Sequence, residues 1–216
     1  MLMNDNTLLS IFQIVILVFS AVVHEVSHGY AALAQGDQTA KFYGRLTLNP
    51  IKHLDPIGSI FLPLFLFLAR TSFLFAYAKP VPVNPDNFRD TKYGVAKVSF
   101  AGPGSNLAIA IAIGIVIRIG SVFVVGFDGS RIQSLLIMAV FINVLLAVFN
   151  LLPIPPLDGS KILFTLLPYR TRMQFGEAEI FLEKWGMVIL FGFLFIGGFS
   201  ILSPLLFFLT SLFAGI

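Results

Sequence analysis

The sequence HEVSH, from His24 to His28, lies inside an apolar run that extends from Leu8 to Ala34. That run is long enough for a membrane-spanning helix, in which each charge held at the bilayer centre costs about 2.5 to 3.5 kcal/mol. The two imidazoles are four residues apart, so both project from one face of a helix. Imidazoles at this spacing, beside a glutamate that can act on metal-bound water, indicate a zinc hydrolase placed in a membrane.

The composition agrees with a membrane setting. Hydrophobic residues make up 57% of the 216 residues, charged residues make up 12%, and the mean hydropathy is +0.91. Soluble domains carry roughly 25% charged residues, so we expect a multi-pass membrane protein with one integral-membrane domain over residues 1–216. There is no cysteine, which leaves histidine and carboxylates as the strong metal ligands. The N-terminal residues lack the basic region of a signal peptide, so the first apolar run is expected to be retained.

Hydropathy predicts an all-α bundle. The expected helices cover Leu8 to Ala34, Val95 to Ile119, Ser134 to Leu152, and Gly186 to Phe213, the last with a bend or reversal at Gly197-Gly198. A further apolar segment extends from Ile57 to Tyr77.

Two connecting segments have patterns of their own. Short alternating runs at Ala40 to Tyr43 and Arg45 to Leu48, broken by Gly44, predict a small β hairpin or sheet after the first helix. The stretch from Lys79 to Phe88 is rich in proline and is expected to be an ordered loop, because proline disfavours both helix and inner strand.

Two histidines do not complete a hydrolytic zinc site, which usually has three protein ligands and one position for water. The best candidate for the third is Asp158, which follows the proline-rich turn in FNLLPIPPLDGSKIL. Proline makes the backbone irregular there, and irregular backbone in a membrane occurs only where protein or a water-filled cavity surrounds it. Alternatively, Asp158 is a helix N-cap. His53, or a glutamate in the segment before the last helix, would then be the third ligand; these glutamates are Glu177, Glu179 and Glu183.

Several motifs in this order resemble the site-2 protease family of intramembrane zinc metalloproteases. The resemblance covers HEVSHGYAA, GRLTLNPIKHLDPIGS, AKPVPVNPDNFRD, AGPGSN and FNLLPIPPLDGSKIL, over roughly Val22 to Leu163. It implies the compact form of the family, without PDZ or CBS modules. It also implies a site with zinc bound by His24, His28 and Asp158, with Glu25 as the general base and with Asn150 beside the metal.

A shared metal constrains the topology. The HEVSH motif and Asp158 both lie at C-terminal helix ends, so the helices that precede them must run parallel, with an odd number of crossings between them. One of the two intervening apolar segments must fail to cross, and Pro63 and Arg70 make Ile57 to Tyr77 the weaker span, so we expect a re-entrant hairpin there. Most lysines and arginines then lie on the side of the metal. The positive-inside rule makes that side cytoplasmic, in a cell membrane.

The predicted function is that of an endopeptidase that cuts transmembrane segments within the lipid bilayer. The resemblance suggests membrane-tethered regulators or signal-peptide remnants as substrates. Asn150, and less directly Asn106, are candidates for holding the substrate backbone or the developing oxyanion. The alternative is a membrane zinc transporter or sensor without enzymatic activity. Basic patches with interleaved aromatics are not evident, so nucleic acid is not an expected partner.

Overall fold

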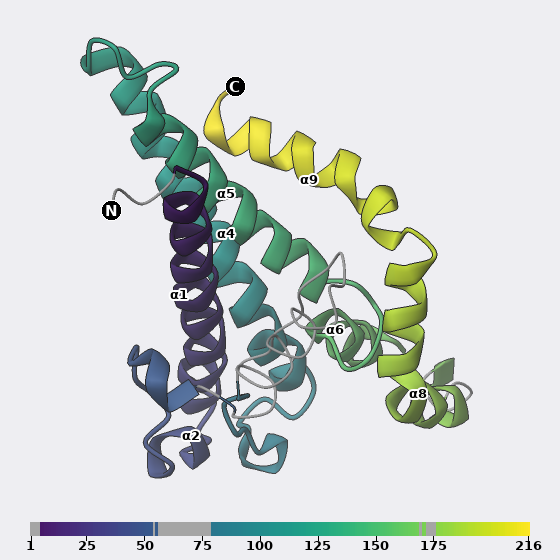
Figure 1. Ribbon diagram of the computed structural model, residues 1–216. Coiled ribbons are helices and arrows are strands. Elements are labelled where there is room, and N and C mark those ends of the chain that lie inside the picture. The colour runs from purple at the N-terminus through teal and green to yellow at the C-terminus, as the bar shows by residue number, and fades with distance from the viewer. Residues whose placement is uncertain (1–4, 54, 56–78, 169, 172–175) are drawn as a thin grey trace.

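The computed structural model describes residues 5–53, 55, 79–168, 170–171 and 176–216. The described part is helical, and its elements carry the labels of Figure 1. In chain order they are α1 (Asp5–Ala34), α2 (Thr39–Phe42), the short 3-10 helices η1 (Pro50–His53) and η3 (Pro85–Asn87), α4 (Gly94–Phe123), α5 (Arg131–Asn150), α6 (Asp158–Leu166), α8 (Gly176–Phe195) and α9 (Gly198–Ala214).

Three helices are long and apolar enough to cross a membrane: Leu8–Ala34 of α1, Gly94–Phe123 (α4) and Arg131–Asn150 (α5). Figure 1 shows α1 and α5 running in the same direction and α4 running in the opposite one. The pair α8 and α9 is also apolar enough but is bent by 77°. The predicted break at Gly197-Gly198 is confirmed there, because Gly197 ends the turn with a φ of +98°, which favours glycine.

The main hydrophobic core lies between α4, α5 and α9. Ala110 of α4, Val140 and Val144 of α5 and Leu206 of α9 are fully buried in it. The backbones of α4 and α9 approach closely at Gly114, where a Cβ atom would lie 2.1 Å from the carbonyl oxygen of Phe213. A small residue at this contact is what close helix packing in membranes requires.

The predicted β hairpin after the first helix is wrong. The segment Thr39–Phe42 is the helix α2, and residues 45–49 form no strand in the described part of the chain. The Asp37 carboxylate accepts hydrogen bonds from the Thr39 N–H at 3.0 Å and the Thr39 hydroxyl at 2.5 Å, which starts a helical turn directly after α1. The guanidinium of Arg45 then donates to the Lys79 carbonyl at 2.8 Å. The Arg45 side chain, and not a ladder of backbone hydrogen bonds, therefore joins this segment to the chain at Lys79.

The re-entrant hairpin expected at Ile57 to Tyr77 lies outside the described residues. His53 and Lys79 are described on the two sides of it. The Lys79 N–H donates a hydrogen bond of 2.8 Å to the His53 carbonyl, so the chain leaves and returns at one place beside the C-terminal end of α1.

Candidate metal centre

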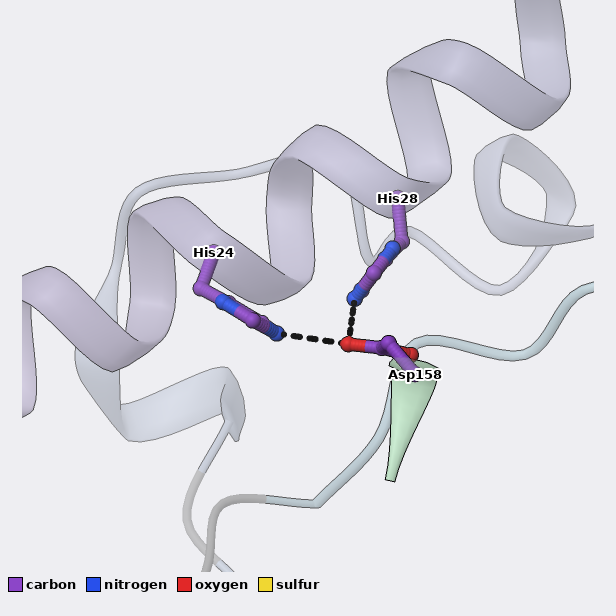
Figure 2. Close-up of side chains that lie close together, drawn as sticks. All are labelled: His24, His28 and Asp158. Atoms are coloured by element: carbon purple, nitrogen blue, oxygen red, sulfur yellow. Dashed lines mark hydrogen bonds and ion pairs between the residues drawn. The ribbon is translucent and has the colours of Figure 1, made fainter. Parts of the chain in front are cut away.

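Three side chains from two distant parts of the chain meet in one buried cluster. The helix α1 presents His24 and His28 from one face, and Asp158 begins α6 (Figure 2). The Oδ2 atom of Asp158 lies 3.2 Å from Nε2 of His24 and 3.2 Å from Nε2 of His28. All three ligand atoms lie within 4.8 Å of one another, and all three side chains are buried. This is a group of residues that could hold a metal ion.

The local structure around Asp158 explains how the carboxylate reaches α1. The chain leaves α5 at Asn150, turns through the prolines, and starts α6 at Asp158. A Cβ atom at Gly159 would lie 2.1 Å from the carbonyl oxygen of Leu151, so the first turn of α6 packs directly on the end of α5. The glycine after Asp158 therefore sets the depth at which the carboxylate enters the bundle.

Hydrogen bonds to the other imidazole nitrogens establish where the protons are. Nδ1 of His28 lies 2.7 Å from the Val98 carbonyl oxygen, and Nδ1 of His24 lies 2.7 Å from Oδ1 of Asn106. A carbonyl oxygen can only accept, so each Nδ1 must donate. In the neutral imidazoles, both Nε2 atoms then carry lone pairs that face Asp158.

Three acceptor atoms facing one another repel unless a cation lies among them. The Lys161 ammonium lies 3.7 Å from Oδ1 of Asp158, and a positive charge at that distance favours the ionised form of the carboxyl. The carboxyl is therefore ionised. The cluster offers two imidazole nitrogens and one carboxylate oxygen, which is the donor set of a catalytic zinc site.

The distances and the space beside the cluster also fit a metal. Two ligands bound tetrahedrally at about 2.1 Å lie about 3.4 Å apart, close to the observed separations between Asp158 and each imidazole. The helix α4 passes the cluster at Gly102, where a Cβ atom would lie 2.5 Å from Nε2 of His24 and 2.4 Å from Nε2 of His28. The missing side chain thus leaves room next to both nitrogens.

Glu25 lies next to the cluster in the sequence but not in its ligand set. Its side chain is half-buried, and its Oε2 atom accepts a hydrogen bond of 2.9 Å from the Val81 N–H in the proline-rich loop. A carboxylate held by a backbone donor beside a metal group can exchange protons with a water molecule there.

Among the other candidate residues, Asn106 contacts the metal group, and Asn150 and His53 have partners elsewhere. Asn106 is fully buried and contacts His24, as described above. The side-chain amide of Asn150 donates to the Leu146 carbonyl of its own helix at 2.8 Å. His53 is 1% exposed, and its Nε2 atom lies 2.8 Å from the Thr47 carbonyl oxygen, so it is buried within its own connecting segment. The described metal group does not include His53 or the glutamates of α8.

Two buried polar residues were missed from the sequence. Asp37 is fully buried and binds the proline-rich loop through the Asn84 N–H at 2.8 Å and the Asn87 amide at 2.9 Å. Asn143 is 1% exposed in the middle of α5, and it accepts a hydrogen bond of 3.1 Å from Asn106. An amide inside an apolar membrane helix was a signal that could have identified Asn143.

Comparison with known proteins places the chain in a family. The model of peptidase family M50 matches residues 126–193, which include Asp158. YwhC of Bacillus subtilis, a candidate zinc metalloprotease by its name, is 38% identical over 206 residues, which cover 89% of this chain and 90% of the relative. Rip2 of Mycolicibacterium smegmatis, named in the same way, is 30% identical over 176 residues, which cover 79% of this chain and 61% of the relative. No solved structure matches the chain.

The chain belongs to the site-2 protease family, peptidase family M50. The apolar helices and this membership make it an integral membrane protein of the metalloprotease class.

Proposed function

We propose that this protein is an intramembrane zinc endopeptidase that hydrolyses peptide bonds in the transmembrane segments of other proteins. The observation that supports the proposal most directly is the convergence of two Nε2 lone pairs and one ionised carboxylate on one point beside a membrane-spanning helix. The metal ligands in this proposal are His24, His28 and Asp158. The relatives' names, which specify zinc metalloproteases, support zinc as the metal.

The chemistry divides between the metal and the chain. A bound zinc ion lowers the pKa of a water ligand to about 7 and polarises the scissile carbonyl. Glu25 acts as general base, takes a proton from the attacking water and delivers it to the leaving amine. Asn150, at the C-terminal end of α5, is the candidate for holding the substrate backbone. Its amide already donates to the Leu146 carbonyl, so this role requires the amide to exchange partners or its oxygen to accept.

The basic residues support a cytoplasmic position of the site in a cell membrane. Near the C-terminal end of α1 and the N-terminal end of α4, which lie at the same end of the bundle in Figure 1, are most of the described basic residues: Lys41, Arg45, Lys52, Lys79, Arg89, Lys92 and Lys97. Arg118 and Arg131 lie toward the opposite end. By the positive-inside rule the first group is cytoplasmic. Membrane-tethered regulators or signal-peptide remnants are then the proposed substrates.

Four proteins test the proposal: wild type, His24→Ala, Glu25→Gln and Asp158→Ala, each purified in nanodiscs. Zinc is measured by elemental analysis, and cleavage of a model membrane-spanning peptide is measured by mass spectrometry. We expect His24→Ala and Asp158→Ala to lose both zinc and cleavage, and Glu25→Gln to retain zinc but not cleave. Cleavage by Glu25→Gln would refute the role of the base. An Asp158→Ala protein that retained zinc would refute the ligand set, and zinc transport by wild type without cleavage would favour a transporter.

A further inference from the structure

A chain of buried amides leads away from the metal group through three helices. Nδ1 of His24 in α1 faces Oδ1 of Asn106 in α4 at 2.7 Å. The Nδ2 atom of Asn106 donates to Oδ1 of Asn143 in α5 at 3.1 Å and to the Ser20 carbonyl at 3.2 Å. The Nδ2 atom of Asn143 donates to the Ala139 carbonyl at 2.9 Å.

The backbone carbonyls at the end of this series of hydrogen bonds determine which atom donates in each bond. The Ala139 and Ser20 carbonyls can only accept, so each must face the NH₂ group of its asparagine. Asn143 therefore turns its carbonyl oxygen to Asn106, and Asn106 turns its own carbonyl oxygen to His24. The last acceptor in the series requires a proton on Nδ1 of His24. The chain of amides thus leaves Nε2 unprotonated when the imidazole is neutral.

Because both asparagines are buried, their side-chain amides are held in this one orientation. Asn106 is 0% exposed and Asn143 is 1% exposed, so water cannot readily replace a partner. A buried amide left without a partner costs about 1 to 3 kcal/mol, so a flipped Asn106, whose oxygen would face the Ser20 and Asn143 oxygens, is disfavoured. His28 has no such dependence, because its Nδ1 donates directly to the Val98 backbone carbonyl.

We propose that Asn143 is a positioning residue for the metal centre. Through Asn106 it holds His24 in the tautomer that can bind the metal, although it does not itself contact the metal group. The proposal rests on the proposed function only to the extent that His24 is a metal ligand. Groups that orient metal-bound histidines in this way typically contribute about 10- to 100-fold to metal affinity.

The test compares Asn143→Leu with Asn143→Asp in the full chain. Leucine has a similar size but offers no acceptor to Asn106, whereas the carboxyl group of aspartate keeps an oxygen for Asn106 in either protonation state. Thr210→Val is the matched control, since Thr210 is a buried polar residue of α9 whose hydroxyl has no partner among the described residues. Zinc dissociation constants are measured by competition with a chelator, and the coordination is monitored by the visible absorption of bound cobalt(II).

We expect Asn143→Leu to weaken zinc binding about 10- to 100-fold and to change the cobalt spectrum. We expect Asn143→Asp and Thr210→Val to bind as wild type does. Wild-type affinity and spectrum in Asn143→Leu would overturn the proposal, as would an equal loss in Thr210→Val.

A measurement on the wild type covers the case in which Asn143→Leu does not fold. In the metal-free protein with neutral imidazoles, ¹⁵N NMR of labelled histidine should show a protonated Nδ1 at His24, assigned by its loss in His24→Ala. A deprotonated Nδ1 would overturn the proposal. Failure of the proposed function has a different signature, because a wild-type protein that binds zinc with the expected tautomer but does not cleave peptides would refute only the peptidase.

Discussion

The carboxylate of Glu25 accepts a hydrogen bond of 2.9 Å from the backbone N–H of Val81, and this contact joins the HEVSH helix to the proline-rich loop. The loop is itself held at both ends. Arg45 donates to the Lys79 carbonyl near its start, and Asp37 binds the segment around Asn84. The proposed base is thus oriented by a backbone donor in an anchored loop, which fixes its direction relative to the metal group.

Replacing Val81 with proline removes the N–H that Glu25 accepts. Val81 already lies between Pro80 and Pro82, so an extended backbone is expected at this position and proline is compatible with it. We expect kcat of peptide cleavage to fall about 10- to 100-fold, as for a small misplacement of a catalytic group, with zinc content unchanged. Val81→Ala is the control, because it shortens the side chain and keeps the N–H. Equal activity of the two variants would show that the contact does not orient Glu25.

Replacing Gly102 with alanine should weaken metal binding. Its Cβ atom would lie 2.4 to 2.5 Å from the Nε2 atoms of both histidines, closer than any ordinary contact. We expect a loss of zinc affinity larger than about 10-fold, measured by chelator competition. Gly104→Ala, two residues further along α4, is the matched control. Its Cβ atom would meet the movable side chain of Phe100 at 3.2 Å and should leave zinc affinity near that of wild type. Normal zinc binding by Gly102→Ala would contradict the geometry of the cluster.

The Asp37 carboxylate should make the stability of the proline-rich loop depend on pH. Burial raises the pKa of Asp37, but hydrogen bonds from Asn87, Thr39 and Asn84 outweigh burial and lower it from 3.8. A lowered pKa stabilises the folded loop fully at neutral pH, and this contribution is lost as pH falls through the folded pKa, below about 3.8.

Hydrogen exchange of the loop amides measures this effect. The protection factors of the loop amides, which correct for the pH dependence of intrinsic exchange, should fall at acidic pH in wild type. They should not fall in Asp37→Asn, whose side chain cannot ionise. At neutral pH, Asp37→Ala should lower loop stability by about 1 to 3 kcal/mol, because it leaves buried donors without a partner. A loop equally protected in Asp37→Ala would refute the role of Asp37.

Arg118 should stabilise the C-terminal helix without affecting the metal. Its guanidinium donates to the Phe213 and Leu212 carbonyls at 2.8 and 2.6 Å, which satisfies the last turn of α9. Arg118→Ala should weaken that turn by about 1 kcal/mol, seen as roughly fivefold faster hydrogen exchange of its amides. Zinc affinity should not change, because Arg118 lies at the end of α4 away from the cluster. A loss of zinc in this variant would indicate coupling between the two ends of the bundle.

Local patterns predicted the three spanning helices well, but they predicted the start of α8 and the segment after α1 poorly. The apolar runs located α1, α4 and α5 to within a few residues, and glycine at 197 and 198 located the bend before α9. The alternation around Tyr43 predicted a strand, but the chain forms a helical turn there because the Asp37 carboxylate bonds Thr39. A strand also needs a partner, and an alternating pattern of a few residues does not reveal whether one exists.

By itself the sequence determined the membrane setting and the two imidazoles on one helical face, because both depend on spacing within a single helix. Asp158 could be selected as the candidate third ligand from its motif, but only the tertiary structure brought its carboxylate to 3.2 Å from histidines that lie 130 or more positions earlier. The positions of Gly102, Asn106 and Asn143 next to the cluster and to one another likewise came only from the tertiary structure. Close approach of helices and the direction of hydrogen bonds between them depend on how α1, α4 and α5 pack, and no local spacing encodes that packing.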